Sequence, residues 1–141
     1  MPSSARPWRG TRFVAVVEAY LALTVADLGL RLLPFRWLTR TLRGARAQAG
    51  ADLSKVSEVS SAIAAGGRLA LTPTCLRQAF AAAWMLRRRG IASQLHYGIA
   101  KRPAGGFHAH AWLLAGGVPV VGEQLADAFE LVAVFPDTPD R

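Results

Sequence analysis

The chain has a single cysteine, Cys75, at a position where a thiol can be activated as a nucleophile. Thr72 and Pro73 just before it are typical of an N-cap and a first helical position, and residues 76–89 follow without a helix breaker. This pattern predicts that Cys75 lies in the first turn of a helix, where unpaired backbone N–H groups and the helix dipole favour a thiolate. A lone cysteine is more often a small buried core residue, so a catalytic interpretation needs a partner residue.

Two histidines lie in the alternating segment of residues 107–113. In an extended strand His108, His110 and Trp112 point to the same face. A cysteine on a helix opposite a histidine on a strand is the arrangement of a thiolate–imidazolium pair, in which the histidine accepts the thiol proton and later protonates the leaving amine. The alternation does not distinguish His108 from His110. A two-histidine metal site is a weaker alternative, because no carboxylate lies nearby in this segment.

A third group is expected to orient the imidazole, and the carboxylates of Glu123, Asp127 and Glu130 follow closely enough in the sequence. Glu123 comes just after the strand that a Gly116-Gly117 turn folds back beside the histidine strand. A solvated loop carboxylate is the structural alternative for Glu123. The residues alone therefore leave the third group open.

Three helices are expected before the cysteine helix. The first covers residues 13–33, is apolar on most faces and ends at a proline, after a basic arm formed by the first dozen residues. The second covers residues 35–42, and a linker over residues 44–50 follows it. Asp52 is a plausible N-cap for the third helix, which the pair Gly66-Gly67 is expected to end.

After residue 90 the apolar period changes from helical to extended. The second and third expected strands join in a hairpin through Gly116 and Gly117, and Pro119 places the third strand at an edge or a bulge. Helices followed by an antiparallel sheet define an α+β fold, with a frayed tail over residues 136–141. The expected strands cover residues 92–100, 107–115, 118–121 and 130–135.

The composition describes one compact domain with a real core. The chain has 141 residues, of which 52% are hydrophobic and 18% charged, so it falls outside the class of disordered chains. One cysteine allows no intramolecular disulfide and no Cys-rich zinc site, which fits a reducing cytoplasm.

The net charge of +8 is concentrated in the first part of the chain. Residues 1–50 carry eight Arg against Glu18 and Asp27, whereas residues 51–141 carry nine basic and seven acidic groups. An electrostatic partner is therefore expected at the N-terminal part, and no nucleic-acid-binding motif accompanies the arginines. Because charges interrupt the first helix, we expect neither a transmembrane span nor a secretory signal.

Four segments in unbroken order resemble the transglutaminase-like cysteine proteases of lasso-peptide biosynthesis. The likeness runs from about Asp52 to Phe135, and the apolar first helix is similar to that of the stand-alone leader peptidases of this family. The segments are Thr74-Cys75-Leu76-Arg77-Gln78-Ala79, Leu86-Arg87-Arg88-Arg89-Gly90-Ile91, Leu95-His96-Tyr97-Gly98-Ile99 and His110-Ala111-Trp112.

The resemblance implies a transglutaminase- or papain-like core in residues 51–141, preceded by a basic, apolar helical region in residues 1–50. It implies a cytoplasmic thiol protease of antibiotic biosynthesis that removes the leader of a ribosomally made lasso precursor peptide (a RiPP). The implied partners are the leader peptide, a RiPP recognition element protein and the ATP-dependent lasso cyclase. No cofactor, metal, nucleic acid or membrane span is implied.

The resemblance also assigns roles within the site. Cys75 matches the nucleophile and His110 the base, which makes His108 a flanking residue. The family's acid stands about a dozen residues after that histidine, where this chain has Gly122 and then Glu123. Glu123 is therefore predicted as the third catalytic residue by way of a one-residue bulge, with Asp127 as the alternative. Acyl transfer to an amine and a non-catalytic peptide-binding scaffold are the competing functions.

Overall fold

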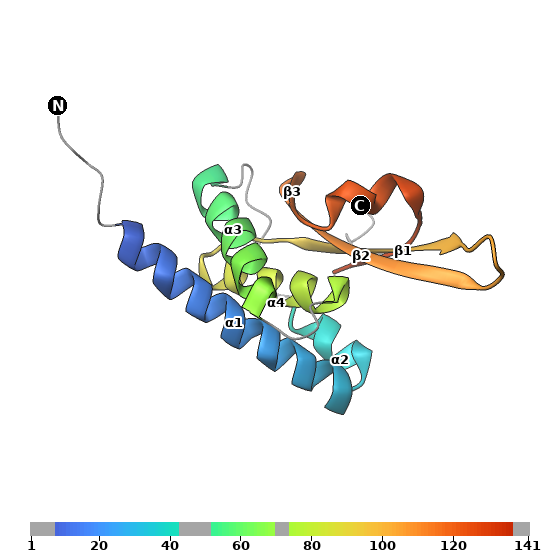
Figure 1. Cartoon of the computed structure of the whole chain (residues 1–141), viewed down its shortest axis with the longest axis horizontal. Coiled ribbons are helices and arrows are strands. Elements are labelled where there is room, and N and C mark those ends of the chain that lie inside the picture. The colour runs from blue at the N-terminus through green and yellow to red at the C-terminus, as the bar shows by residue number, and fades with distance from the viewer. Residues whose placement is uncertain (1–7, 43–51, 70–73, 137–141) are drawn as a thin grey trace.

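The computed structural model describes residues 8–42, 52–69 and 74–136, and within them helices precede an antiparallel sheet, as expected (Figure 1). The α+β fold class is thus confirmed. The elements are α1 (Trp8–Leu32), α2 (Phe35–Arg40), α3 (Leu53–Leu69), α4 (Cys75–Arg88), β1 (Gln94–Lys101), β2 (Phe107–Ala115), β3 (Val118–Val121), the 3-10 helix η1 (Glu123–Ala128) and β4 (Glu130–Phe135).

The four strands form one sheet in the order β3-β2-β1-β4, with every neighbouring pair antiparallel. The β2–β3 turn is the predicted one, because Gly116 and Gly117 have φ values of 56° and 78° that favour glycine. Pro119 lies on the edge strand β3 beside a shift in register, which confirms that prediction. The first strand begins at Gln94 rather than at residue 92.

Helix α1 begins earlier than predicted, at Trp8, so the expected basic arm is wrong from that residue on. Arginine is a good helix former, and Arg9 and Arg12 extend the helix towards its N-terminus. Its end at Leu32, ahead of Pro34, is as predicted. The expected linker over residues 44–50 lies outside the described residues, as does the tail beyond residue 136.

Helix α3 continues through the two glycines that were expected to end it. A Cβ atom at Gly66 would lie 3.2 Å from both the Ala19 Cβ and the Tyr20 backbone nitrogen of α1. Gly66 therefore allows α3 and α1 to approach closely, and this packing outweighs the low helix propensity of glycine. The prediction that the helix ends at Gly66-Gly67 was wrong, because Gly66 is required for close helix packing and does not terminate the helix.

The inner face of α1 belongs to the hydrophobic core of the whole molecule. Ala15, Ala19, Leu23 and Ala26 are buried in the same cluster as residues of the later helices and of the sheet. The four α-helices gather on one side of the molecule, and the β1–β2 hairpin extends away from them (Figure 1). The predicted boundary near residue 50 stays a prediction, but the helix before it is part of the same core.

The outer face of α1 is apolar and exposed. Phe13 is 71% exposed and Leu21 57% exposed, so the helix presents hydrophobic side chains to its surroundings as well as to the core. By length and hydropathy alone the stretch Arg12–Leu32 could cross a membrane. The expectation that the chain does not span a membrane therefore stays a prediction.

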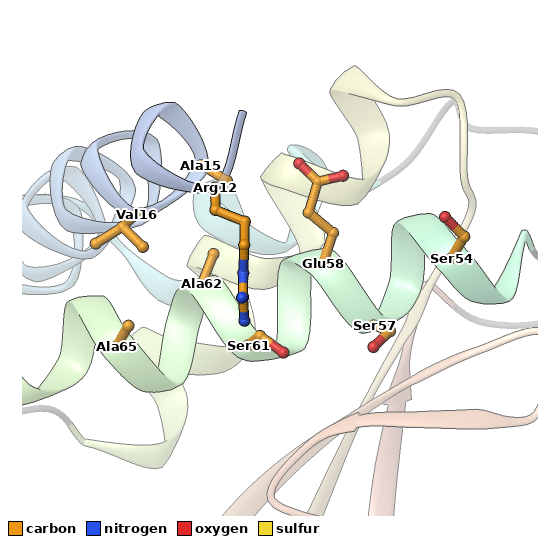
Figure 2. A pocket seen from close by; sticks show the side chains of 9 residues that line it. All are labelled: Arg12, Ala15, Val16, Ser54, Ser57, Glu58, Ser61, Ala62 and Ala65. Atoms are coloured by element: carbon orange, nitrogen blue, oxygen red, sulfur yellow. The ribbon is translucent and has the colours of Figure 1, made fainter. Parts of the chain in front are cut away.

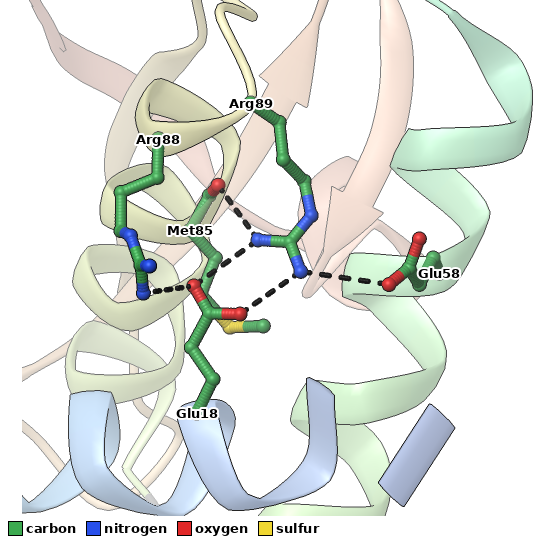
Figure 3. A network of polar contacts seen from close by, with 5 residues as sticks. All are labelled: Glu18, Glu58, Met85, Arg88 and Arg89. Carbon is green, nitrogen blue, oxygen red and sulfur yellow. Dashed lines mark hydrogen bonds and ion pairs between the residues drawn. The ribbon is translucent and has the colours of Figure 1, made fainter. Parts of the chain in front are cut away.

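Ion pairs join α1 to both ends of α4. Glu18 binds Arg88 at 2.8 Å and Arg89 at 2.9 Å, and Arg89 also reaches Glu58 of α3 at 3.5 Å (Figure 3). At the other end, Asp27 binds Arg77, two residues after the cysteine, at 2.6 Å. These pairs set the position of α4, and with it the position of Cys75, against α1.

Candidate active site

Cys75 and His110 line the same pocket, which has a volume of about 320 Å³. The cysteine comes from the first residue of α4 and the histidine from the middle of β2. The pocket wall is completed by residues of α3, α4 and β3 and by Gly122, which follows β3. The tertiary structure therefore brings together the two residues that were predicted to form a catalytic pair.

The N-terminus of α4 places Cys75 as predicted, but with a different cap. The N-cap is Thr74, whose hydroxyl accepts a hydrogen bond from the Arg77 backbone N–H at 3.4 Å. The predicted capping residues Thr72 and Pro73 lie outside the described residues, and the helix begins two residues later than they implied. Cys75 is thus the first helical residue, with a free, partly buried thiol among the helix-start N–H groups.

His110 is only 7% exposed, and two aromatic rings and a backbone carbonyl contact its imidazole. Its ring stacks on Trp112 with centroids 5.9 Å apart and on Phe129 with centroids 5.0 Å apart. Its Nε2 lies 2.9 Å from the carbonyl oxygen of Gly122. Because a carbonyl only accepts, Nε2 carries the proton in this bond, which leaves Nδ1 as the basic nitrogen of the neutral ring.

The predicted sharing of one strand face is confirmed, since His108 and His110 both contact Phe129. His108, however, is exposed and does not line the pocket with Cys75. The structure thus distinguishes the two histidines that the alternation could not, because only His110 lines the pocket with Cys75.

The predicted third residue, Glu123, is the first residue of η1 and has an exposed side chain. Asp127, the alternative, is also exposed, and so is Glu130 at the start of β4. Among the hydrogen bonds of the described residues, the partner of His110 is the Gly122 carbonyl and not a carboxylate. The assignment of Glu123 stays a prediction of the family resemblance.

His96 is a site neighbour that the sequence did not single out. It pairs across the sheet with Trp112, and their rings lie 5.7 Å apart. Its Nε2 is buried and has no hydrogen-bond partner in the described part of the chain. Burial lowers the pKa of His96, and the nearby charge of Glu123 partly opposes this effect. His96 is therefore held in the neutral form.

Gln78 and Ser60 are polar pocket residues that the sequence also left unassigned. The Ser60 hydroxyl donates to the Val120 carbonyl at 2.8 Å and so is already occupied. Gln78 lies three residues after Cys75 on α4, a spacing that places two side chains on one helix face. That spacing is the signal that could have identified Gln78 from the sequence.

A larger pocket of about 460 Å³ lies between α1 and α3, away from the cysteine (Figure 2). Arg12 extends over α3 towards Ser61, and two more serines, Ser54 and Ser57, line the same side. This pocket offers hydrogen-bond donors and acceptors but no thiol or imidazole. In the described residues, no group of three or more His, Cys, Asp or Glu side chains is placed to hold a metal ion.

A cysteine at a helix start that shares a pocket with a histidine on an antiparallel sheet defines a candidate cysteine-dependent catalytic domain. Residues 20–134 match the model of the Transglutaminase-like superfamily, and the chain belongs to that superfamily. The superfamily includes cysteine peptidases and acyltransferases, and a cysteine-based activity is typical of it. Searches of the curated proteins and of the solved structures found no match.

Proposed function

We propose that this protein is a cysteine peptidase that removes the leader from a ribosomally made lasso precursor peptide. The observation that carries the peptidase chemistry is the shared pocket of Cys75 and His110. The substrate class rests on the resemblance of the segments around both residues to lasso leader peptidases. Membership of a superfamily that contains cysteine peptidases supports the same reading.

In this proposal Cys75 and His110 carry out the steps of amide hydrolysis. His110 Nδ1 accepts the thiol proton, and the Cys75 sulfur attacks the scissile carbonyl carbon to form a tetrahedral oxyanion. When the oxyanion collapses, the C–N bond breaks and the imidazolium gives its proton to the departing amine. Water, deprotonated by the same imidazole, then cleaves the thioester, which releases the leader carboxylate and restores the thiol.

The oxyanion needs hydrogen-bond donors, and the pocket offers two. The Cys75 backbone N–H lies at the helix start, where no intrahelical acceptor is available to it. The side-chain amide of Gln78 is the second donor in this proposal, because it lines the pocket one turn further along α4.

The partners in this proposal are the leader peptide, the recognition element protein and the lasso cyclase. An apolar groove of about 380 Å³ between α1 and α4 supports protein docking, with Val17, Leu21, Val25 and Trp84 in its wall. Basic side chains are enriched in the same N-terminal part of the chain, which favours an acidic partner surface.

Acyl transfer to an amine is the second candidate, because the same thioester can be resolved by an amine instead of by water. The two outcomes differ in the mass of the product. A non-catalytic scaffold of this fold would give neither product.

The test incubates the purified full chain with its precursor peptide and recognition protein and follows the products by mass spectrometry. We expect release of the intact leader as a free acid, no release by Cys75→Ala, and a turnover number about 10²-fold lower for Gln78→Met, which keeps the size but removes the donor. Cleavage by Cys75→Ala at the rate of the parent would refute the nucleophile. An amine adduct would favour acyl transfer, and no product from any variant would favour the scaffold.

A further inference from the structure

We propose that the main-chain carbonyl of Gly122, and not a carboxylate, is the group that orients the imidazole of His110. This inference rests on the proposed function for its catalytic meaning, because it names the positioning group of the same site. The role that a carboxylate side chain has in a Cys-His-acid triad would then belong to the backbone.

The contact itself is short and partly buried. His110 Nε2 donates to the Gly122 oxygen at 2.9 Å, and the ring plane is held by its stacking on Trp112 and Phe129. With Nε2 occupied and the ring plane set, Nδ1 is the nitrogen left to exchange a proton with Cys75. This is the tautomer that a base needs when it is oriented through its other nitrogen.

The residue type at position 122 is what allows this contact. Gly122 has φ 79° and ψ 0°, a left-handed conformation that L side chains rarely adopt. A Cβ atom there would lie 2.8 Å from the Ala111 carbonyl oxygen and 3.3 Å from His110 Nε2. Any side chain at this position would therefore push the backbone, and the carbonyl with it, away from the imidazole.

The side chains of the two carboxylates nearest in sequence are exposed. Glu123 follows Gly122 directly, but its side chain is exposed, and its charge acts on His96. Asp127, also on η1, is exposed as well. Two other titratable groups lie near His110: Cys75 lines the same pocket, and His108, two residues earlier on β2, contacts Phe129 as His110 does.

A neutral acceptor changes the electrostatics of the pair. A hydrogen bond to a carbonyl stabilises an imidazolium less than one to a carboxylate, because it lacks the charge–charge attraction. The thiolate must then be stabilised mainly from its own side, by the N-terminus of α4. The site is thus better described as a cysteine–histidine pair with a backbone orienter than as a triad of three side chains.

The test observes the Nε2 proton of His110 by long-range ¹⁵N–¹H correlation in the full chain carrying Cys75→Ala, which removes the thiol. We expect a solvent-protected Nε2–H that Glu123→Gln and Asp127→Asn leave unchanged. Gly122→Ala should raise its exchange rate up to about tenfold, the usual effect of losing one hydrogen bond. Gly117→Ala is the matched control, because Gly117 has a φ of 78° with nothing near its absent Cβ.

Loss of the protected proton in Glu123→Gln or Asp127→Asn, or its absence from the parent, would overturn the proposal. If Gly122→Ala does not fold, the Nε2 proton in the parent, Glu123→Gln and Asp127→Asn still tests the proposal. The proposed function is tested separately through the only thiol of the chain, by following Cys75 alkylation with iodoacetamide against pH. An identical profile in the parent and His110→Ala would refute the thiolate–imidazolium pair, whereas the Nε2 proton would still report the orienting group.

Discussion

The environments of the three histidines differ although two of them share one strand and the third lies on its neighbour. His110 lines the pocket and is bonded, His108 is exposed, and His96 is partly buried with an unpartnered Nε2. The residue type is the same in all three, so its chemistry is decided by what surrounds each ring.

His96 should make the stability of the fold depend on pH. Its pKa is lowered in the folded chain by burial, so below the unfolded value of about 6.5 the unfolded chain binds more protons than the folded one. The stability is therefore complete above that value and falls as the pH drops through it. We expect a lower urea midpoint at pH 5.5 than at pH 7, and a smaller difference in His96→Gln.

His108→Gln is the matched control, because this histidine is exposed on the adjacent strand. It should keep the full pH dependence of the parent. An equal loss of pH dependence in both variants would contradict the role given to His96.

The helices are held together by packing and by ion pairs that differ in exposure. The neighbouring residues Arg88 and Arg89 both bind Glu18, but the side chain of Arg88 is 74% exposed and that of Arg89 only 18% exposed. Arg89 also donates to the Met85 carbonyl at 3.0 Å, and its bond to Glu18 raises its pKa. We therefore expect Arg89 to contribute more than Arg88 to the stability of the fold, within the network that Figure 3 shows.

Arg89→Gln should destabilise the chain by about 1–3 kcal/mol, because it leaves Glu18 largely without its partly buried partner. Arg88→Gln should change the free energy of unfolding by less than about 1 kcal/mol, as is usual for an exposed pair. Chemical denaturation of both variants measures the difference. Equal effects would show that the burial of the pair does not matter here.

At the scale of the whole molecule, one face of α1 is part of the hydrophobic core and the other face is an exposed apolar surface. Its inner alanines and Leu23 are buried with the sheet residues, while Leu21 and Val25 on the outer face are exposed in the apolar groove. A single helix thus links the stability of the part that carries the candidate site to the face where we propose that a partner docks.

A chain that begins at Asp52 should consequently lose cooperative unfolding, since it exposes the core that α1 covers. Circular dichroism during thermal unfolding tests this expectation. The double variant Leu21→Ser, Val25→Ser in the full chain should keep the thermal midpoint within a few degrees but weaken the proposed leader cleavage in the presence of the proposed recognition protein. A cooperative transition in the truncated chain would mean that α1 is not part of the core.

Several features follow from neighbours in the sequence. The placement of Cys75 in the first turn of a helix, the turn at Gly116-Gly117 and the shared face of His108 and His110 depend on residues a few positions apart, so local patterns predict them. Gly66 shows the limit of such patterns. Its meaning depends on Ala19, which lies 47 positions earlier in the chain but 3.2 Å away from its absent Cβ in space.

The sequence by itself determined the α+β order of elements, the place of the single thiol at a helix start and two candidate histidines. Only the tertiary structure decided that His110 shares the pocket with Cys75 and that a backbone carbonyl contacts its other nitrogen. The physical reason is that the residue type states which functional group a side chain carries, whereas every residue carries the same backbone carbonyl. Which carbonyl meets the imidazole depends on the path of the chain at Gly122, and that path is set by packing between distant segments.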